Sequence, residues 1–227
     1  MKNSILLLFL GLVISSCSPF KKYAGTQDKW EKEVSNLLEK DKTETYSDDA
    51  ILFIGSSSIR LWDDIAKDMA PYEPIRRGYG GAKFSDLIHF TERIVYPHNF
   101  QALCIFVAND ITGGYDDRTP KEVLTLQKQV IKTVRKKYPA VPIFQIAITP
   151  VNNRWSVWDE TQQANALMKA HAEKTPNLYF IETADGYLGE DGKPISTLFR
   201  DDQLHMKPDG YHIWARIIKA ELDKVLK

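Results

Sequence analysis

The chain has 227 residues, of which 43% are hydrophobic and 26% are charged, so it can build a globular core and wholesale disorder is excluded. Thirty Lys and Arg residues balance thirty Asp and Glu residues, and this lack of net charge argues against nucleic acid as a partner. Two cysteines are too few for a disulfide scaffold.

The first residues have the pattern of an export signal. Lys2 precedes an unbroken apolar stretch from Ile5 to Ile14, which as a helix would rise about 15 Å and fall short of a bilayer core of about 30 Å. The run from Ile14 to Cys17 resembles the bacterial lipobox, which implies a signal peptide over residues 1–16 and a lipid on Cys17. We therefore expect an exported protein that touches the membrane of the bacterial cell envelope only through this lipid anchor. Simple secretion and a retained helix are the alternatives.

After a polar tether predicted over residues 17–26, short runs rich in β-branched residues alternate with segments of helical period. Strands are predicted over residues 50–54, 73–76, 102–107, 142–148 and 178–181. Helices are predicted over residues 27–40, 58–67, 83–95, 120–138, 160–174 and 208–225. This alternation predicts a single domain over residues 27–227, with the α/β fold of a parallel sheet covered by helices on both faces.

Polar residues and glycines come after each predicted strand, where the carboxyl ends of parallel strands meet along one edge. A serine hydroxyl becomes a strong nucleophile when an imidazole takes its proton and a carboxylate orients that imidazole. Ser57, His205 and Asp202 supply these three groups. The developing oxyanion needs donors aimed at one point, and we expect them to be the amides of Ser57 and Gly81 and the side chain of Asn109.

Together these segments resemble the SGNH hydrolases, also called the GDSL esterase and lipase family, in four blocks: Phe53–Ser58, Arg77–Gly81, Val107–Asp110 and Asp202–His205. The resemblance covers residues 51–205 and implies a flavodoxin-like five-stranded sheet and ester hydrolysis with no metal and no cofactor. Ser57, Gly81, Asn109, Asp202 and His205 match the functional positions of the family. Ser56 and Val107 stand where the family usually has Asp and Gly, which leaves the choice of Ser57 over its serine neighbours open.

Each block by itself has a simpler interpretation as a helix cap, a turn or a surface ion pair. Four blocks in order at strand ends favour a hydrolase. The five histidines lack metal-binding spacing, and Cys104 lies in an apolar run typical of a buried thiol.

The candidate substrate contacts are aromatic side chains. Residues 152–158 combine amide side chains and an arginine with Trp155 and Trp158, and aromatic faces suit sugar rings. Together with Tyr79 these tryptophans are candidate substrate contacts, although both tryptophans could instead pack the loop onto the sheet. The predicted activity is removal of short acyl groups, acetyl first, from a carbohydrate or cell-wall glycan. A lysophospholipase or a lipid esterase like platelet-activating-factor acetylhydrolase is the alternative enzyme, and a non-catalytic glycan-binding lipoprotein is the alternative of another class.

Overall fold

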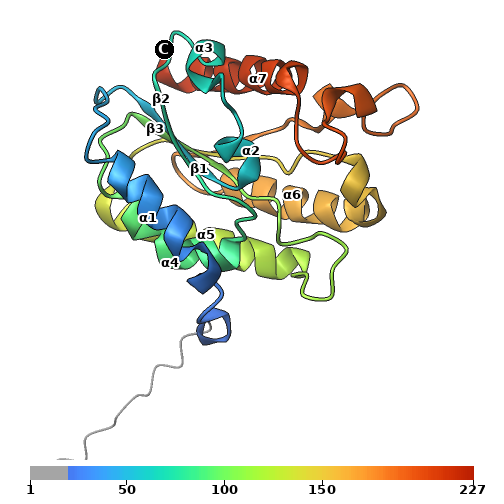
Figure 1. Ribbon diagram of the computed structural model, residues 1–227, viewed down its shortest axis with the longest axis horizontal. Coiled ribbons are helices and arrows are strands. Elements are labelled where there is room, and N and C mark those ends of the chain that lie inside the picture. The colour runs from blue at the N-terminus through green and yellow to red at the C-terminus, as the bar shows by residue number, and fades with distance from the viewer. Residues whose placement is uncertain (1–19) are drawn as a thin grey trace, which may run out of the picture.

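A computed structural model describes residues 20–227 (Figure 1). Cys17 and the predicted signal peptide lie outside these residues. Five strands pair in parallel in the order β2-β1-β3-β4-β5. They are β1 (Ile51–Gly55), β2 (Pro74–Gly78), β3 (Ala102–Phe106), β4 (Ile143–Ile146) and β5 (Leu178–Ile181). The predicted five-stranded parallel sheet is confirmed.

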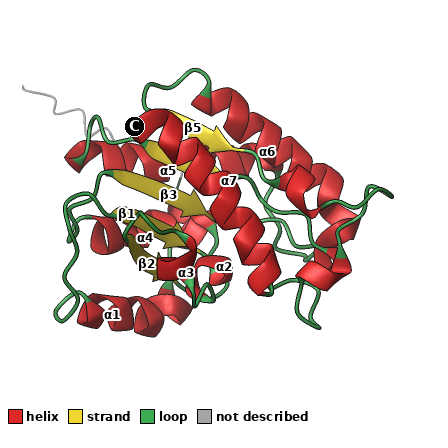
Figure 2. Ribbon diagram, turned by 90° about the horizontal axis from the view of Figure 1, so that it is seen from above, coloured by secondary structure: helices red, strands yellow, loops and turns green. Residues whose placement is uncertain are grey.

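Helices cover both faces of this sheet (Figures 1 and 2). One face carries α1 (Glu31–Lys40), α4 (Phe84–Val95), α5 (Pro120–Lys137) and α6 (Trp158–Ala172). The other carries α2 (Ser57–Arg60), α3 (Ile65–Asp68) and α7 (Pro208–Leu226). Short 3-10 helices are η1 (Lys21–Tyr23), η2 (Asp28–Trp30), η3 (Asn152–Val157), η4 (Ala184–Tyr187) and η5 (Ser196–Leu198). Between residues 20 and 227, no helix combines the length and the apolar character that crossing a bilayer demands.

The central strand β1 is buried on both faces, which explains its continuous apolar sequence. Leu52 and Ile54 pack toward α4 and α5, whereas Ile51 and Phe53 pack toward α7. Successive side chains of a strand point to opposite faces, so this single strand contributes to both cores.

The chain order reverses at β1, which has β2 on one side and β3 on the other. In open α/β sheets the ligand site lies at such a reversal, outside the carboxyl ends of the strands. Gly55 ends β1 with φ of +134°, and a Cβ there would overlap the carbonyl oxygen of Phe106. Glycine therefore lets β1 run close against β3 and turn at once into α2, which begins at Ser57.

The predicted helix over residues 58–67 is in fact two short helices, α2 and α3, with Trp62 between them. Trp62 is fully buried, its ring stacks on Tyr211 at a centroid distance of 5.4 Å, and its indole N–H donates to Asp68 at 2.7 Å. The helix breaks because the chain must turn to place this large ring beneath α7.

The tether predicted over residues 17–26 is wrong for its described part. Tyr23 is only 3% exposed, and its carbonyl lies 3.1 Å from a ring nitrogen of His89 on α4. The Thr26 hydroxyl donates to the carbonyl of Ser85 at 3.1 Å, and Lys22 pairs with Glu122 on α5. Aromatic burial and polar contacts thus fix this segment on the domain.

Candidate active site

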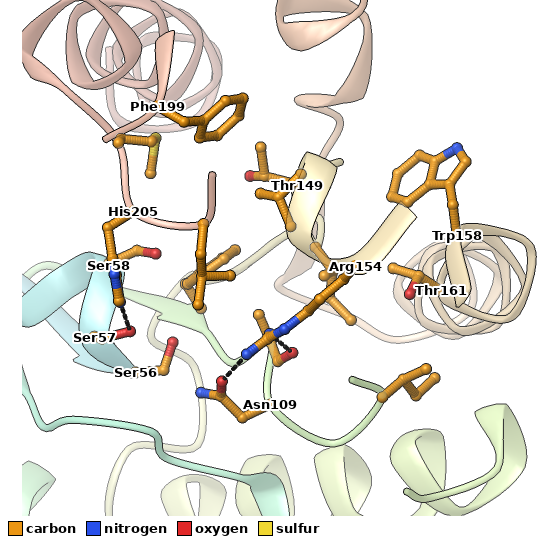
Figure 3. A pocket seen from close by; sticks show the side chains of 17 residues that line it. Ser56, Ser57, Ser58, Asn109, Thr149, Arg154, Trp158, Thr161, Phe199 and His205 are labelled. Carbon is orange, nitrogen blue, oxygen red and sulfur yellow. Dashed lines mark hydrogen bonds between the residues drawn. The ribbon is translucent and has the colours of Figure 1, made fainter. Parts of the chain in front are cut away.

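Ser57, His205 and Asp202 are joined by two consecutive hydrogen bonds. Figure 3 shows the first of these, between Ser57 and His205. The Ser57 hydroxyl lies 3.0 Å from Nε2 of His205, and Nδ1 of His205 lies 2.6 Å from Oδ2 of Asp202. An ionised carboxylate only accepts hydrogen bonds, so Nδ1 carries the ring proton and Nε2 is left to accept from the serine. The fold therefore brings a hydroxyl to a base from 148 positions away in the chain.

Asp202 is fixed by its own turn. Its Oδ1 accepts the backbone N–H groups of Leu204 and His205, each at 3.0 Å. Partial burial raises the pKa of this carboxyl, but the two amides and the His205 ring outweigh it and lower the pKa to about 2. Asp202 is thus a carboxylate at neutral pH, with one oxygen committed to the turn and the other to the imidazole.

The local geometry distinguishes the three adjacent serines. Ser56 is 1% exposed and precedes α2 as its N-cap, whereas the carbonyl of Ser58 accepts the hydroxyl of Tyr211 at 3.0 Å. Of these three hydroxyls, Ser57 has the hydrogen bond with His205. Val107, the other departure from the family pattern, is fully buried in the core. Ala108 and Asn109, which follow it, still line the cavity.

Asn109 lines the cavity beside Ser57, while Gly81 does not. Gly81 lies on the loop after β2, and the side-chain Nδ2 of Asn109 donates to the carbonyl of the next residue, Ala82, at 3.0 Å. The two predicted oxyanion donors are therefore joined through Ala82. Gly81 has φ of +63°, and a Cβ there would lie 2.8 Å from the ring of Trp30.

The N-terminal segment braces this glycine loop. The indole N–H of Trp30 donates to Oδ2 of Asp86 at 3.1 Å, and the same oxygen accepts the amide of Lys83. Glu33 on α1 accepts the amide of Gly80 at 2.8 Å. Nothing in the sequence pattern signalled these roles, because the partners are about 50 residues apart.

The three candidate substrate contacts have different positions. The side chain of Tyr79 is fully buried and packs against Trp30 and Phe90, so its prediction as a substrate contact is wrong. Trp158 lines the cavity, and Trp155 stacks on it with ring centroids 6.0 Å apart and planes at 15°. Trp155 keeps a partly exposed face outside the cavity.

Arg154 is a site residue that the sequence analysis did not single out. It lies on η3, the segment after β4, and its guanidinium donates to the carbonyl of Ala108 and to Oδ1 of Asn109, both at 2.6 Å. Burial lowers the pKa of Arg154, and the charge of Asp117 opposes this shift. Its position after a strand end was the signal that could have identified it.

Asp110 lies directly behind the site and is 1% exposed. Its Oδ2 accepts the backbone N–H of Phe84 at 2.8 Å, while its Oδ1 has no hydrogen-bond partner. Burial raises the pKa of this carboxyl to about 7. Across residues 20–227, no three His, Cys, Asp or Glu side chains are grouped so that they could hold a metal ion.

Comparison with known families matches residues 47–213 to the GDSL-like lipase/acylhydrolase family. This span includes all four blocks and the three hydrogen-bonded residues Ser57, His205 and Asp202. The protein belongs to this family. It is therefore a hydrolase of ester bonds. Comparison with curated proteins gives no match.

Solved structures with the same fold include a protein from Streptococcus pneumoniae named for platelet activating factor (TM-score 0.74, 20% identity, 87% of this chain and 94% of that chain). A GDSL-like lipase from Bacteroides thetaiotaomicron gives a TM-score of 0.68 at 15% identity, covering 84% and 97% of the two chains. A carbohydrate esterase family 3 protein from Talaromyces cellulolyticus gives 0.62 at 13% identity, covering 78% and 97%. At these identities the likeness concerns the fold.

Proposed function

We propose that this GDSL-family hydrolase is a serine esterase that removes short acyl groups, acetyl in the first place, from a carbohydrate or cell-wall glycan. The observation that carries the proposal is the hydrogen-bonded set Ser57, His205 and Asp202, of which Ser57 and His205 line a small, mostly apolar cavity.

In the proposed mechanism His205 accepts the proton of Ser57 as the serine oxygen attacks the ester carbonyl. The resulting oxyanion is stabilised by the Nδ2 group of Asn109 and the amide of Ser57, residues that line the cavity. The amide of Gly81, on the adjoining loop, is the third donor that the family resemblance implies. His205 then returns the proton to the leaving alcohol, which departs and leaves an acyl group on Ser57. Water, deprotonated by His205, attacks this acyl-enzyme, and collapse of the second oxyanion releases the acid and restores the serine hydroxyl.

The cavity volume supports a short acyl group. It is about 30 Å³, which is small for a long acyl chain and therefore favours a short acyl group such as acetyl. Apolar side chains surround it and favour a methyl group over a charged one: Phe106, Ile111, Ile148, Val151 and Phe199.

The tryptophan pair supports a sugar as the alcohol part of the ester. Trp158 forms part of the cavity wall, and Trp155 continues its aromatic surface outward with a nearly parallel ring. Such faces bind the C–H surfaces of sugar rings. The carbohydrate esterase among the solved structures of this fold is consistent with that choice.

A panel of esters tests the proposal: p-nitrophenyl esters from C2 to C12, acetylated xylan, acetylated peptidoglycan fragments and lysophosphatidylcholine. We expect the highest kcat/KM at C2, acetate release from at least one glycan, and loss of activity in Ser57→Ala. Ser35→Ala is the matched control, because Ser35 lies on α1 and does not line the cavity.

Other outcomes of the panel are equally informative. Preference for lysophosphatidylcholine or for long p-nitrophenyl esters would replace the glycan substrate with a lipid ester. Undiminished activity in Ser57→Ala would refute the acyl-enzyme mechanism. A wild-type protein that binds glycans, hydrolyses no ester and takes no label from a fluorophosphonate would favour a binding role.

The proposal also includes export and attachment to the cell envelope through Cys17, with no membrane contact beyond that anchor. It is supported by the sequence pattern alone. Partitioning of the protein into the detergent phase of Triton X-114, lost in Cys17→Ala, would support the anchor, and partitioning of the wild type into the aqueous phase would contradict it.

A further inference from the structure

Arg154 occupies a position in the cavity that the mechanism above does not use. Figure 3 shows its side chain crossing the cavity toward Asn109, where its guanidinium donates to Oδ1 of Asn109 and to the carbonyl of Ala108, each at 2.6 Å. Among the described residues that line this cavity, Arg154 alone carries a permanent charge. A charged group in a mostly apolar cavity costs free energy that its hydrogen bonds must offset, so its presence there needs an explanation.

The neighbours of Asn109 determine which way its amide faces. A guanidinium only donates hydrogen bonds, so the atom facing Arg154 must be the amide oxygen. A carbonyl oxygen only accepts, so the atom facing Ala82 must be the amide nitrogen. The nitrogen has two hydrogens and Ala82 takes one, which leaves the other free for an oxyanion at Ser57. Without Arg154 only the bond to Ala82 would hold this orientation.

The positive charge of Arg154 also favours Asn109 as a hydrogen-bond donor to an oxyanion. The two hydrogen-bond acceptors of Arg154 are a carbonyl and an amide oxygen, so its guanidinium is not hydrogen-bonded to a carboxylate within residues 20–227, and the charge of Asp117 offsets its own only through space. A charge-assisted hydrogen bond to Oδ1 polarises the amide and makes the N–H groups on Nδ2 stronger donors. Positive charge behind the donor also stabilises negative charge that develops in front of it.

The segment that carries Arg154 is hydrogen-bonded to the loop that carries Asp202 and His205. The amide of Asn153 donates to the carbonyl of Gln203 at 3.1 Å, and its side chain donates to the carbonyl of Asp202 at 3.2 Å. The side chain of Asn152 donates to Oε1 of Gln203 at 2.9 Å. Three consecutive residues therefore link the loop that carries the acid and base to the loop that carries Asn109.

We propose that Arg154 is a positioning residue of the oxyanion hole, which fixes the amide of Asn109 with its nitrogen toward Ser57 and strengthens that nitrogen as a donor. The inference rests on the proposed role of Asn109 in ester hydrolysis. It predicts that Arg154 acts only through Asn109.

The test is a double-mutant cycle on p-nitrophenyl acetate with Arg154→Met, Asn109→Ala and the double variant. Removing one oxyanion donor costs about 10²–10³ in kcat, so we expect this loss for Asn109→Ala. Arg154→Met should lower kcat about 10- to 100-fold with KM within twofold of wild type. The double variant should be within about threefold of Asn109→Ala, because without the amide Arg154 has nothing left to orient.

Arg135→Met is the matched control. Arg135 also donates to backbone carbonyls, those of Tyr138, Val141 and Asn177, but at the opposite ends of the strands. It should leave kcat unchanged even if it lowers the melting temperature. If Arg154→Met does not fold, Arg154→Lys enters the cycle in its place and should show a smaller loss of kcat, again confined to backgrounds with Asn109.

Four results would overturn the inference. Multiplicative losses in the double variant would show that Arg154 acts independently of Asn109. A rise in KM for a carboxylate-bearing ester, with kcat on p-nitrophenyl acetate unchanged, would make Arg154 a substrate contact. An unchanged kcat in Asn109→Ala would remove the oxyanion role of Asn109 and the inference with it, whereas a loss in Asn109→Ala without one in Arg154→Met would refute the inference alone.

Discussion

Replacing Asp202 with Asn should harm catalysis more than replacing it with Ala. The turn at Asp202 requires an oxygen that accepts the amides of Leu204 and His205, so the oxygen of Asn should take the Oδ1 position. The amide nitrogen then replaces Oδ2 and donates to Nδ1 of His205. This moves the ring proton to Nε2, where the imidazole can no longer accept a proton from Ser57.

The magnitude follows from the contact between the two side chains. A carboxylate and an imidazolium about 4 Å apart between charge centres attract by about 1 kcal/mol in water and about 4 kcal/mol near a protein surface. The side chains of His205 and Asp202 are 23% and 45% exposed, so the pair lies between these limits. Asp202→Ala should therefore lower kcat about 10- to 10³-fold, and Asp202→Asn, with the wrong tautomer imposed, about 10⁴-fold.

Steady-state kinetics on p-nitrophenyl acetate at pH 7 to 9 would measure both variants, with thermal unfolding as the check on folding. The imidazole ¹⁵N chemical shifts of His205 would report the tautomer directly, with the proton on Nδ1 in the wild type and on Nε2 in Asp202→Asn. Equal or higher activity in Asp202→Asn than in Asp202→Ala would refute the reasoning.

Three further predictions concern Gly81, Asp110 and Cys104. Gly81→Ala should lower both the melting temperature and kcat/KM, the latter at least tenfold, because positive φ costs about 1 kcal/mol and the new Cβ meets the ring of Trp30; thermal unfolding and kinetics check this, and an unchanged variant would contradict it. Folded Asp110 keeps its proton up to about pH 7, whereas the unfolded chain loses it near pH ~4, so wild-type stability falls as pH rises through this window. Urea unfolding should show that the unfolding free energy of Asp110→Asn rises by up to about 4 kcal/mol relative to that of the wild type between pH ~4 and ~7. The same pH dependence of unfolding free energy in both proteins would exclude the raised pKa. Burial raises the pKa of Cys104 far above its usual value, so iodoacetamide at neutral pH should label this thiol only after unfolding, as mass spectrometry would show.

The fold was largely predictable because its local signals agree with its tertiary packing. Each predicted strand lies within one or two residues of the observed one, since apolar runs such as residues 51–55 are bounded by glycine or polar residues. The break between α2 and α3 was not predictable, because it depends on where the Trp62 ring can be buried. The packing of Tyr23 depends in the same way on contacts with distant helices.

The candidate site shows the same division. Ser57, Asn109 and His205 follow from residue type and from their place after strands, and the fold brings them to one cavity. Tyr79 was misjudged because its place in the glycine block says nothing about which way its ring turns. Arg154 was missed because an arginine in a loop is ordinary. Its place after a strand end was the one signal in the sequence, and in the structure its two short hydrogen bonds distinguish it.

The brace that Trp30 and Glu33 form under the glycine loop bears on where the enzyme can be shortened. The family match begins at residue 47 and ends at 213, whereas these two braces precede it and the buried Trp214 follows it. A protein trimmed to the boundaries of the family would retain every reacting group and still lose part of the scaffold that aims them. Expression of the enzyme for assay or crystallisation therefore needs the flanking sequence on both sides.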